Sequence, residues 1–496
     1  MMPRRTPPRL LWTALLVLML GLGARPAETL ETRIDRILDA EPVATAFWGV
    51  YVRDLASGRV LYARNADKAF IPASNQKLLT TATALDALGP AYRYQTTLYL
   101  DGEADGATLR GDLIVEGAGD PSFGSRKLGG NDPIRAWANA LATMGVRRIE
   151  GRLIGDDDRF DDDAYAAGWD VSYLRTESYA PPPGGLAYRD NLVQVRVEAT
   201  RPGEAPRVET APADYFTVRN QSVTGSRSRG LGPRVDRRLG DDEARLYGEI
   251  PRTYAGTIVL PAADPTAMVL HAFAQALSEA GITVEATRHD VDDLGEAEKP
   301  DYEAARPLFV HVSPPLAELA AVINKESDNL YAEQVFRTFG WGGSYEGGGR
   351  RVKSLLARFG APTDGLSIQD GSGLSRKDLV TPEALGLLLA GMAEHEAADA
   401  FTASMAAGGE PRTTLQHRLR GASVRAKTGS LEYARTLSGY ATSADGRRLS
   451  FVVMANHYTA PAYRIQQAID SVVLTLSTAT VGDAGGDAPE APSKTP

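Results

Sequence analysis

Hydrophobic positions along the chain recur with two different periods, and together they predict a mixed α/β (α+β) fold. Steps of three and four residues are typical of helices with one buried face, whereas apolar and polar alternation is typical of strands. The helical pattern covers 31–40, 74–88, 265–280, 316–323, 330–336 and 462–476. The strand pattern covers 46–52, 59–62, 97–100, 113–115, 148–154, 192–198, 257–260, 423–426, 437–442 and 449–456.

A change in the pattern of predicted helices, strands and turns divides the chain into a discontinuous core domain and an insert. Compact helical and strand patterns fill 28–95 and 303–480, whereas 96–302 alternates short strands with Gly, Pro and Asp turns. We therefore predict a β-rich inserted region with its own small cores, in two subdomains. The length agrees, because a single core rarely grows past roughly 250–300 residues. Gly347 to Gly349 is predicted as a loop, and 481–496, rich in Gly, Ala, Pro and Asp, as a disordered tail.

The first 27 residues have the order of a secretory signal peptide. Three arginines and no acid precede an apolar run at 10–23, and small residues follow near Ala24 and Ala27. The apolar run is short for a membrane span, which needs about 20 residues, although an uncleaved anchor is the alternative. We predict an exported, periplasmic protein with no stable membrane anchor once processed.

Charge and cysteine content narrow the classes of function. The formal net charge is −9, and removing the N-terminal arginines makes the chain more acidic still. This balance excludes a nucleic-acid partner of the usual electrostatic kind. The chain has no cysteine, so neither disulfides nor thiolate chemistry enter the prediction.

The first candidate for chemistry is the segment that begins at Ser74. It reads Ser-Asn-Gln-Lys, so Lys77 lies one helical turn from Ser74 on the same face. A serine hydroxyl needs a base within hydrogen-bond reach to act as a nucleophile. A lysine can be that base when burial or neighbouring positive charge lowers its pKa. On its own, a Ser-x-x-Lys match arises by chance and usually marks an exposed helix position.

Two further motifs follow in the chain, each ordinary by itself. Ser327-Asp328-Asn329 is predicted to lie in the turn between two helices, where all three residue types serve as helix caps. Lys427-Thr428-Gly429 ends a predicted strand, and Ser430 follows it. The value of these motifs lies in their order and their contexts: helix start, inter-helix turn and strand edge.

In this order the motifs resemble the signature of serine penicillin-binding proteins and class A β-lactamases. The 253 residues that separate Ser74 from Ser327 exceed those of a simple β-lactamase. The chain is similar to the type-4, class C low-molecular-mass penicillin-binding proteins, which are D-alanyl-D-alanine carboxypeptidases/endopeptidases. The resemblance includes Gly119-Asp120-Pro121 and the loop from Asp370 to Ser375. It implies a transpeptidase-like domain, in which helices flank an antiparallel sheet, with β-rich inserts.

The resemblance also implies a role for each motif residue. Ser74 would be acylated by the substrate, Lys77 would take its proton, and Ser327 would relay a proton to the leaving D-alanine. The catalytic set is Ser74, Lys77, Ser327, Asn329 and Lys427, with the backbone N–H groups of Ser74 and Ser430 as the oxyanion hole. The substrate-binding set is Asn329, Lys427, Thr428, Gly429 and Ser430, where the glycine lets substrate lie against the strand.

The expected partners are peptidoglycan stem peptides, with β-lactams as inhibitors and a homodimer as a possible assembly. No cofactor and no metal is expected. The six histidines show no paired spacing, and the acidic runs at 156–163 and 290–293 are predicted as solvated turns. Two alternative functions remain at this stage: a serine β-lactamase, which deacylates quickly, and a cell-wall-binding protein that has lost catalysis.

Overall fold

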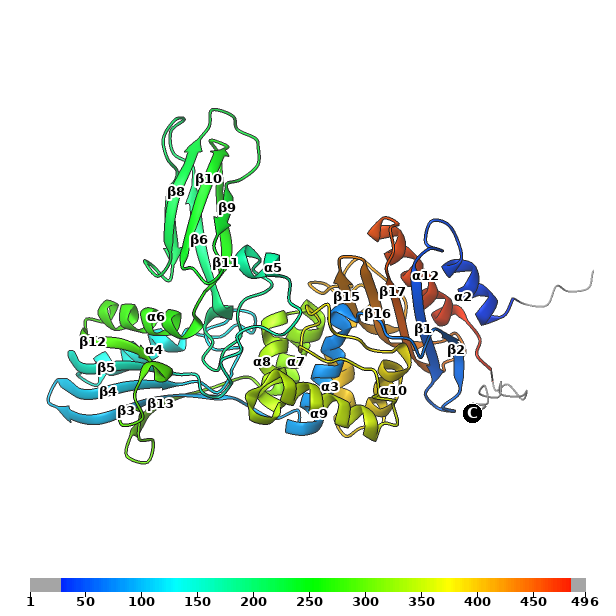
Figure 1. Ribbon diagram of the computed structural model, residues 1–496, viewed down its shortest axis with the longest axis horizontal. Helices are drawn as coiled ribbons and strands as arrows, with labels where there is room; N and C mark the ends of the chain where they lie inside the picture. Colours follow the sequence, from blue (N-terminus) through cyan, green and yellow to red (C-terminus); the bar gives the residue numbers. More distant parts are fainter. Residues whose placement is uncertain (1–27, 483–496) are drawn as a thin grey trace, which may run out of the picture.

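The computed structural model describes residues 28–482 and is drawn in Figure 1. The predicted signal peptide and the predicted tail from 483 onward lie outside the described residues. None of the helices within 28–482 has both the length and the apolar character that a membrane crossing requires.

A six-stranded sheet organises one end of the fold. Its strand order is β14-β15-β16-β17-β1-β2, and every neighbouring pair is antiparallel. The first strand of the chain thus lies inside the sheet, between β17 and the edge strand β2, with Phe47 opposite Asn456. The strands are β1 (Phe47–Asp54), β2 (Val60–Arg64), β14 (Ala406–Ala407), β15 (Val424–Leu431), β16 (Ala434–Thr442) and β17 (Arg448–Asn456).

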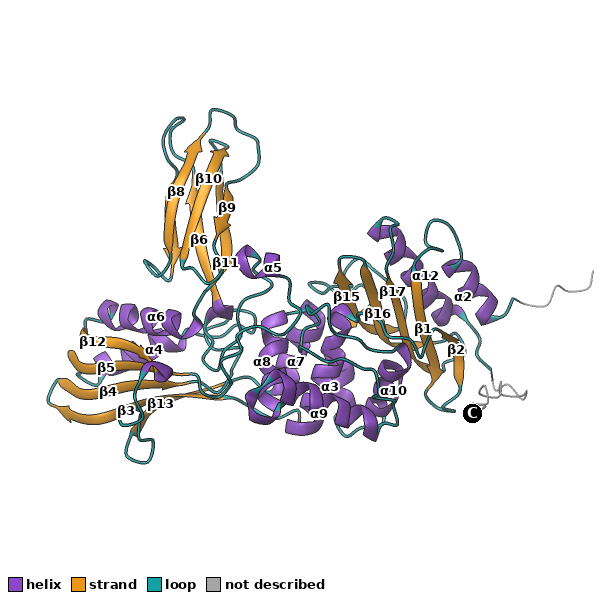
Figure 2. Ribbon diagram, in the orientation of Figure 1, coloured by secondary structure: helices purple, strands orange, loops and turns teal. Residues whose placement is uncertain are grey.

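Helices cover both faces of this sheet because alternate strand residues point to opposite sides. On β1, Val50 and Val52 pack with α2 (Leu30–Leu38) and α12 (Ala462–Thr478). Tyr51, between them, belongs to a larger core on the other face. Figure 2 shows the helices of that second layer gathered beside the sheet. They are α3 (Gln76–Leu88), α7 (Leu316–Ala321), α8 (Asn329–Phe339), α9 (Tyr345–Arg358), α10 (Pro382–Ala393) and α11 (Ala398–Ser404).

The loop predicted at Gly347 to Gly349 is wrong, because these residues form the first turns of α9. A Cβ atom on Gly348 would lie 2.4 Å from the ring of Phe336, and one on Gly347 would lie 2.2 Å from the carbonyl oxygen of Trp341. The glycines therefore allow α9 to pack closely against its neighbours, with Ser344 as the N-cap that begins the helix.

A five-stranded mixed sheet forms the opposite end of the molecule. Its order is β12-β5-β4-β3-β13, with β5 parallel to both β4 and β12. Helices α4 and α6 pack on it through one apolar core, and Asp132 and Asp264 cap them. The elements are β3 (Gln95–Asp105), β4 (Thr108–Glu116), β5 (Arg148–Asp156), β12 (Thr283–Asp290), β13 (Arg306–Val312), α4 (Pro133–Thr143) and α6 (Pro265–Glu279).

Two three-stranded sheets form a projection, which stands at the top of Figure 1. Their orders are β8-β10-β9 and β11-β6-β7. Alternate residues of β6, such as Val195, share a core with Leu246 of β10. The short helix α5 (Val171–Thr176) lies between this projection and the helical layer. The strands are β6 (Leu192–Glu198), β7 (Arg207–Ala211), β8 (Thr217–Thr224), β9 (Arg234–Arg237), β10 (Glu243–Ile250) and β11 (Ala255–Pro261).

Candidate active site

Ser74 lies on a tight 3₁₀ turn, Ala73–Asn75, that leads directly into α3. The preceding residue, Ala73, is fully buried and has a φ of 47°, a left-handed conformation that is costly for a residue with a Cβ atom. The side chain of Asn75 holds the turn against the sheet, because it donates to the carbonyl of Lys427 at 2.6 Å and accepts from Ser438 at 3.0 Å. The strain is therefore held by the packing of this 3₁₀ turn on β15 and β16.

The ammonium group of Lys77 faces three oxygen atoms. It donates to Ser74 Oγ at 3.1 Å, to Asn329 Oδ1 at 2.6 Å and to the carbonyl of Ser372 at 2.7 Å. Complete burial lowers the pKa of Lys77 to about 8, even though nearby Asp370 and Glu333 act in the opposite direction. A neutral Lys77 can keep two of these bonds as a donor and accept the Ser74 proton with its lone pair.

The turn at 327–329 brings the second motif to the same place. Ser327 follows a π-helical segment, Val322–Glu326, and its φ of 65° is left-handed. Asp328 caps α8 by accepting from the N–H of Tyr331 at 2.9 Å. Asn329 uses both ends of its amide: Oδ1 accepts from Lys77, and Nδ2 donates to the carbonyl of Tyr179 at 2.7 Å.

Strand β15 supplies the third motif. Lys427 is fully buried and donates to Ser327 Oγ at 2.8 Å and to the carbonyl of Thr428 at 2.7 Å. Burial, together with the charge of Lys77, holds the pKa of Lys427 well below its usual range. At Gly429 an added Cβ atom would lie 2.0 Å from Thr436 Oγ1 and 3.1 Å from the backbone nitrogen of Ser74. The structure thus gives Gly429 a packing role: it lets β15 lie against the turn of Ser74.

An open cleft of about 470 Å³ runs past the Ser74 hydroxyl. The two motif lysines are buried behind its wall, whereas the hydroxyl-bearing motif residues and Asn329 line it. The lining residues are Ser74, Tyr173, Tyr179, Ser327, Asn329, Gly373, Leu374, Thr414, Thr428, Ser430, Leu431, Glu432 and Arg435. The cleft is lined by the part of β15 beyond its short pairing with β14, and such an unpaired strand edge suits an extended peptide.

Buried carboxyl groups support the cleft from behind. Glu333, one turn after Asn329 on α8, accepts from the backbone N–H groups of Gly371 and Ser372 at 2.9 and 2.8 Å. This pair of bonds orients the Ser372 carbonyl, which accepts a hydrogen bond from Lys77 Nζ. Burial, followed by the charge of Asp370, raises the pKa of Glu333 to about 8. Asp370 itself accepts from the N–H groups of Gly373 and Ser375 and from the Trp169 indole.

The structure brings together every side chain that the sequence motifs selected. Ser74, Lys77 and Asn329 form one hydrogen-bonded set, and Ser327 with Lys427 forms a second. Thr428 and Ser430 line the cleft beside them. Sequence reasoning missed the Ser372 carbonyl, Glu333, Tyr179 and Tyr173. Of these, Glu333 alone left a usable signal, since it lies four residues after Asn329 on the same helical face.

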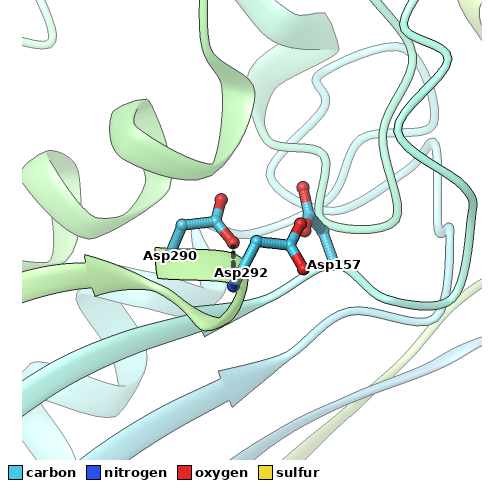
Figure 3. A group of neighbouring side chains, drawn as sticks. All are labelled: Asp157, Asp290 and Asp292. Carbon is cyan, nitrogen blue, oxygen red and sulfur yellow. Dashed lines mark hydrogen bonds between the residues drawn. The ribbon is translucent and has the colours of Figure 1, made fainter. Parts of the chain in front are cut away.

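A second group of acids lies away from the cleft, at the end of the five-stranded sheet (Figure 3). Side-chain oxygens of Asp157, Asp290 and Asp292 lie within 4.8 Å of one another. Burial and the neighbouring carboxylates raise the pKa of Asp157 to about 6 and that of Asp290 to about 7. The prediction of solvated turns is thus wrong for Asp156, which is buried, whereas Asp157 is half-buried and accepts from Thr266 at 2.7 Å. Carboxylates are the ligand type that Ca²⁺ and Mg²⁺ use, but three are fewer than a complete Ca²⁺ shell requires.

Comparisons with known proteins agree with this geometry. The model of the D-Ala-D-Ala carboxypeptidase 3 (S13) family matches residues 30–476. Over 468 residues the chain is 31% identical to a D-alanyl-D-alanine carboxypeptidase of Actinomadura sp. (strain R39), covering 90% of this chain and 84% of that protein. Penicillin-binding protein 4 of Haemophilus influenzae has a similar crystal structure, with a TM-score of 0.75, 23% identity, and coverage of 90% of this chain and 99% of that one. Its complex with a β-lactam matches with a TM-score of 0.71, 22% identity, and coverage of 90% and 100%.

The fold is that of the penicillin-binding proteins, with an antiparallel sheet flanked by helices and additional inserted elements. The chain belongs to the D-Ala-D-Ala carboxypeptidase 3 (S13) family. These findings confirm the predicted fold class and the predicted enzyme class, a serine-type D-Ala-D-Ala carboxypeptidase that acts on peptidoglycan.

Proposed function

We propose that the cleft cleaves the bond between the two terminal D-alanines of a peptidoglycan stem peptide through an ester on Ser74. The observation that carries this proposal is the 3.1 Å contact between Lys77 Nζ and Ser74 Oγ at the wall of the cleft. A base at that distance meets the geometric requirement for activating a hydroxyl. Ser74 Oγ attacks the carbonyl carbon as its proton passes to Lys77.

The other motif residues complete the acylation step. The backbone N–H groups of Ser74 and Ser430 receive the developing oxyanion, a contribution of about 3–4 kcal/mol in comparable sites. Ser327 relays the proton that Lys77 took from Ser74 to the leaving nitrogen as the C–N bond breaks, so D-alanine departs with a neutral amino group and Lys77 is neutral again. The ester on Ser74 remains, and water then hydrolyses it to the shortened peptide and free enzyme. Asn329 orients both Lys77 and the substrate amide.

Thr428 and Lys427 recognise the terminal carboxylate of the substrate. The pKa of Lys427 is depressed by burial and by Lys77 while the cleft is open. An incoming carboxylate favours the charged form of the amine, because opposite charges within about 4–6 Å stabilise each other. Binding of the substrate therefore draws a proton onto Lys427 and strengthens the contact.

The proposal extends to where the protein acts and to how it assembles: it is exported to the periplasm, and it forms a homodimer. The arginine-rich, apolar and small-residue order of 1–27 supports export to the periplasm through a cleavable signal peptide. The substrate lies there, as does the β-lactam that mimics it and acylates the same serine. The homodimer stays a prediction that gel filtration of the purified protein can test.

The decisive experiment measures D-alanine release and covalent labelling together. Incubated with a pentapeptide that ends in D-Ala-D-Ala, the protein should release one D-alanine per peptide. Incubated with penicillin, it should carry a long-lived adduct that peptide mass mapping places on Ser74. Ser74→Ala should lose both properties, while Ser471→Ala, an exposed serine on α12, should keep them. Release of D-alanine by Ser74→Ala would disprove the assigned nucleophile, and rapid turnover of penicillin would favour a β-lactamase instead.

A further inference from the structure

The carboxylate of Asp328, in the middle of the second motif, is paired with Lys127. Lys127 lies 201 residues earlier, in the loop between β4 and α4 that belongs to the predicted insert. The side chain of Asp328 is 15% exposed and that of Lys127 is 26% exposed, so solvent screens the pair only in part. The insert therefore places a cation directly behind the turn that carries Ser327 and Asn329.

Two further groups fix Lys127 in this position. Its ammonium group lies 5.2 Å from the centre of the Tyr331 ring on α8, within the range of a cation–π contact. The hydroxyl of Tyr331 donates to Ser125 at 3.0 Å, two residues before Lys127 in the same loop. The loop is thus attached to the first turn of α8 at two adjacent points.

A strained segment of the insert supplies a second acid to the same lysine. Asp190 Oδ1 lies 3.7 Å from Lys127 Nζ. Asp190 is the middle one of three consecutive residues with left-handed φ angles, 48°, 61° and 53°. Asn191 holds this segment, because its side chain accepts from the N–H of Tyr188 at 2.9 Å and donates to the carbonyl of Pro182 at 2.8 Å. Such conformations persist only where the surrounding structure imposes them.

We propose that Lys127 is a positioning residue of the peptidase: its pair with Asp328 holds the Ser327–Asn329 turn and offsets the negative charge of Asp328 beside Lys77. This inference rests on the proposed function of the cleft. The left-handed conformation of Ser327 gives the turn a reason to need support, since it is costly for a residue with a Cβ atom. Without Lys127, two partly enclosed carboxylates, Asp328 and Asp190, would face each other without their shared cation.

The charges around Lys77 determine how the loss of Lys127 would change the pKa of Lys77, and therefore the pH dependence of acylation. Three acids raise the pKa of Lys77 against the effect of burial. They are Asp370 in the loop before α10, Glu333 on α8 and Asp328 at the N-cap of α8. Lys427 on β15 is the neighbouring cation. Removing Lys127 leaves the charge of Asp328 less compensated, so the pKa of Lys77 should rise. Because Lys77 acts in its neutral form, the acid limb of the acylation profile should move to higher pH.

The test measures acylation by a fluorescent penicillin between pH 6 and 10. Lys127→Ala should lower the second-order rate constant at pH 7 by about tenfold or more and move the acid limb to higher pH. Lys127→Arg should restore both the rate and the limb, because the guanidinium keeps the charge. Lys299→Ala is the matched control: Lys299 is another lysine of the insert, 3.8 Å from an oxygen of Asp158, and its removal should change neither quantity.

Repeating the measurement in a second variant, Asp328→Asn, separates the electrostatic effect of Lys127 from a general destabilisation of the fold. In Asp328→Asn protein, which no longer carries the charge that Lys127 offsets, Lys127→Ala should give no further shift of the limb. An unshifted limb in Lys127→Ala, or a shift that persists in the Asp328→Asn background, would overturn the inference. If Lys127→Ala fails to fold, Lys127→Gln, which keeps most of the side-chain length without the charge, is measured instead. Failure of the wild-type protein to release D-alanine would count against the proposed function, not against this inference.

Discussion

Ser327 and Lys427, 100 residues apart in the chain, are joined by a hydrogen bond of 2.8 Å between Oγ and Nζ. The serine belongs to the turn before α8 and the lysine to strand β15, so this bond fixes the helical wall of the cleft against the sheet. The low pKa of the buried lysine leaves the serine hydroxyl beside an amine that readily exchanges a proton. In the proposed mechanism, proton delivery to the leaving nitrogen would therefore depend on this pair.

Removing the hydroxyl of Ser327 tests whether proton delivery to the leaving nitrogen depends on it. Ser327→Ala should lower kcat/KM for D-alanine release by about 100-fold or more, the usual range for losing a proton-transfer group. The effect should fall mainly on kcat, because Thr428 and Lys427 still hold the carboxylate. Stopped-flow or discontinuous D-alanine assays measure both constants. Ser471→Ala provides the control, and a change in kcat/KM of less than threefold in Ser327→Ala would contradict the role.

The depressed pKa of Lys77 predicts the pH dependence of acylation. Lys77 must be neutral to accept the Ser74 proton, and the neutral fraction increases as pH passes upward through about 8. The rate constant for penicillin acylation should therefore rise between pH 6.5 and 9 and then level off. Lys77→Arg should abolish acylation, because a guanidinium does not lose its proton in this range. A rate that is flat across this interval would show that Lys77 is not the titrating base.

The paired acceptor role of Glu333 predicts a cost in both stability and activity. At pH 9, above its pKa of about 8, Glu333 is a carboxylate, and Glu333→Gln replaces one of the two oxygens that accept from the N–H groups of Gly371 and Ser372 with an amide donor. One buried N–H then loses its partner, which should lower the free energy of unfolding by about 1–3 kcal/mol. The displaced Ser372 carbonyl should also slow acylation. Denaturant unfolding and penicillin labelling check this. Equal stability of Glu333→Gln and the exposed control Glu318→Gln would refute it.

Close approach of β15 to the Ser74 turn predicts that Gly429 tolerates no side chain. In Gly429→Ala the new methyl group would lie 2.0 Å from Thr436 Oγ1 and 2.9 Å from the Pro72 carbonyl. Relief of this overlap must move the strand, at about 1–3 kcal/mol for an overpacked site. We expect a lower melting temperature and acylation reduced by at least tenfold. Gly230→Ala, whose nearest contact would be 3.5 Å, should behave as wild type. Full labelling of Gly429→Ala at the wild-type rate would contradict the packing role.

The acid cluster in Figure 3 predicts a stability that falls as pH rises. The pKa of Asp290 is raised to about 7, so the folded state keeps a proton that the unfolded state releases from about pH 4 upward. This group therefore lowers stability increasingly from about pH 4 to pH 7. Asp290→Asn keeps an oxygen that can accept from the N–H of Asp292, and it should gain about 1 kcal/mol at pH 7.5 after screening, but less than about half of that at pH 5. Thermal unfolding at the two pH values decides. A gain of equal size at both would exclude titration as the cause.

The sequence predicted the centre of the site because its chemistry requires particular side chains at short spacings. Ser74 and Lys77 lie one turn apart, and the turn and strand contexts of the other motifs follow from local capping and alternation. The Ser372 carbonyl, by contrast, belongs to the backbone, and any residue type could supply it. Lys127 and Tyr179 reach the site only through the tertiary placement of the insert, which no local pattern encodes.

The fold was predictable to a similar depth. Periodicity identified most strands and helices, but not which strands are neighbours across long loops. The glycines at 347–349 show a specific limit, since their low helix propensity favoured a loop. Packing overrode that preference, because only a residue without a Cβ atom allows α9 to approach Phe336 and Trp341 so closely.

The position of β1 between β17 and β2 has a consequence for folding during synthesis, because a strand from the start of the chain pairs with one from its end. Ser74, the proposed nucleophile, emerges from the ribosome early, yet β15 and β16, the strands that contact its turn, lie beyond residue 423. Pairings of such long sequence separation form late, after the loop entropy between them has been overcome. A nascent or prematurely terminated chain therefore carries Ser74 and Lys77 without a working cleft. Reactivity toward penicillin should arise only when the last strand has joined the sheet.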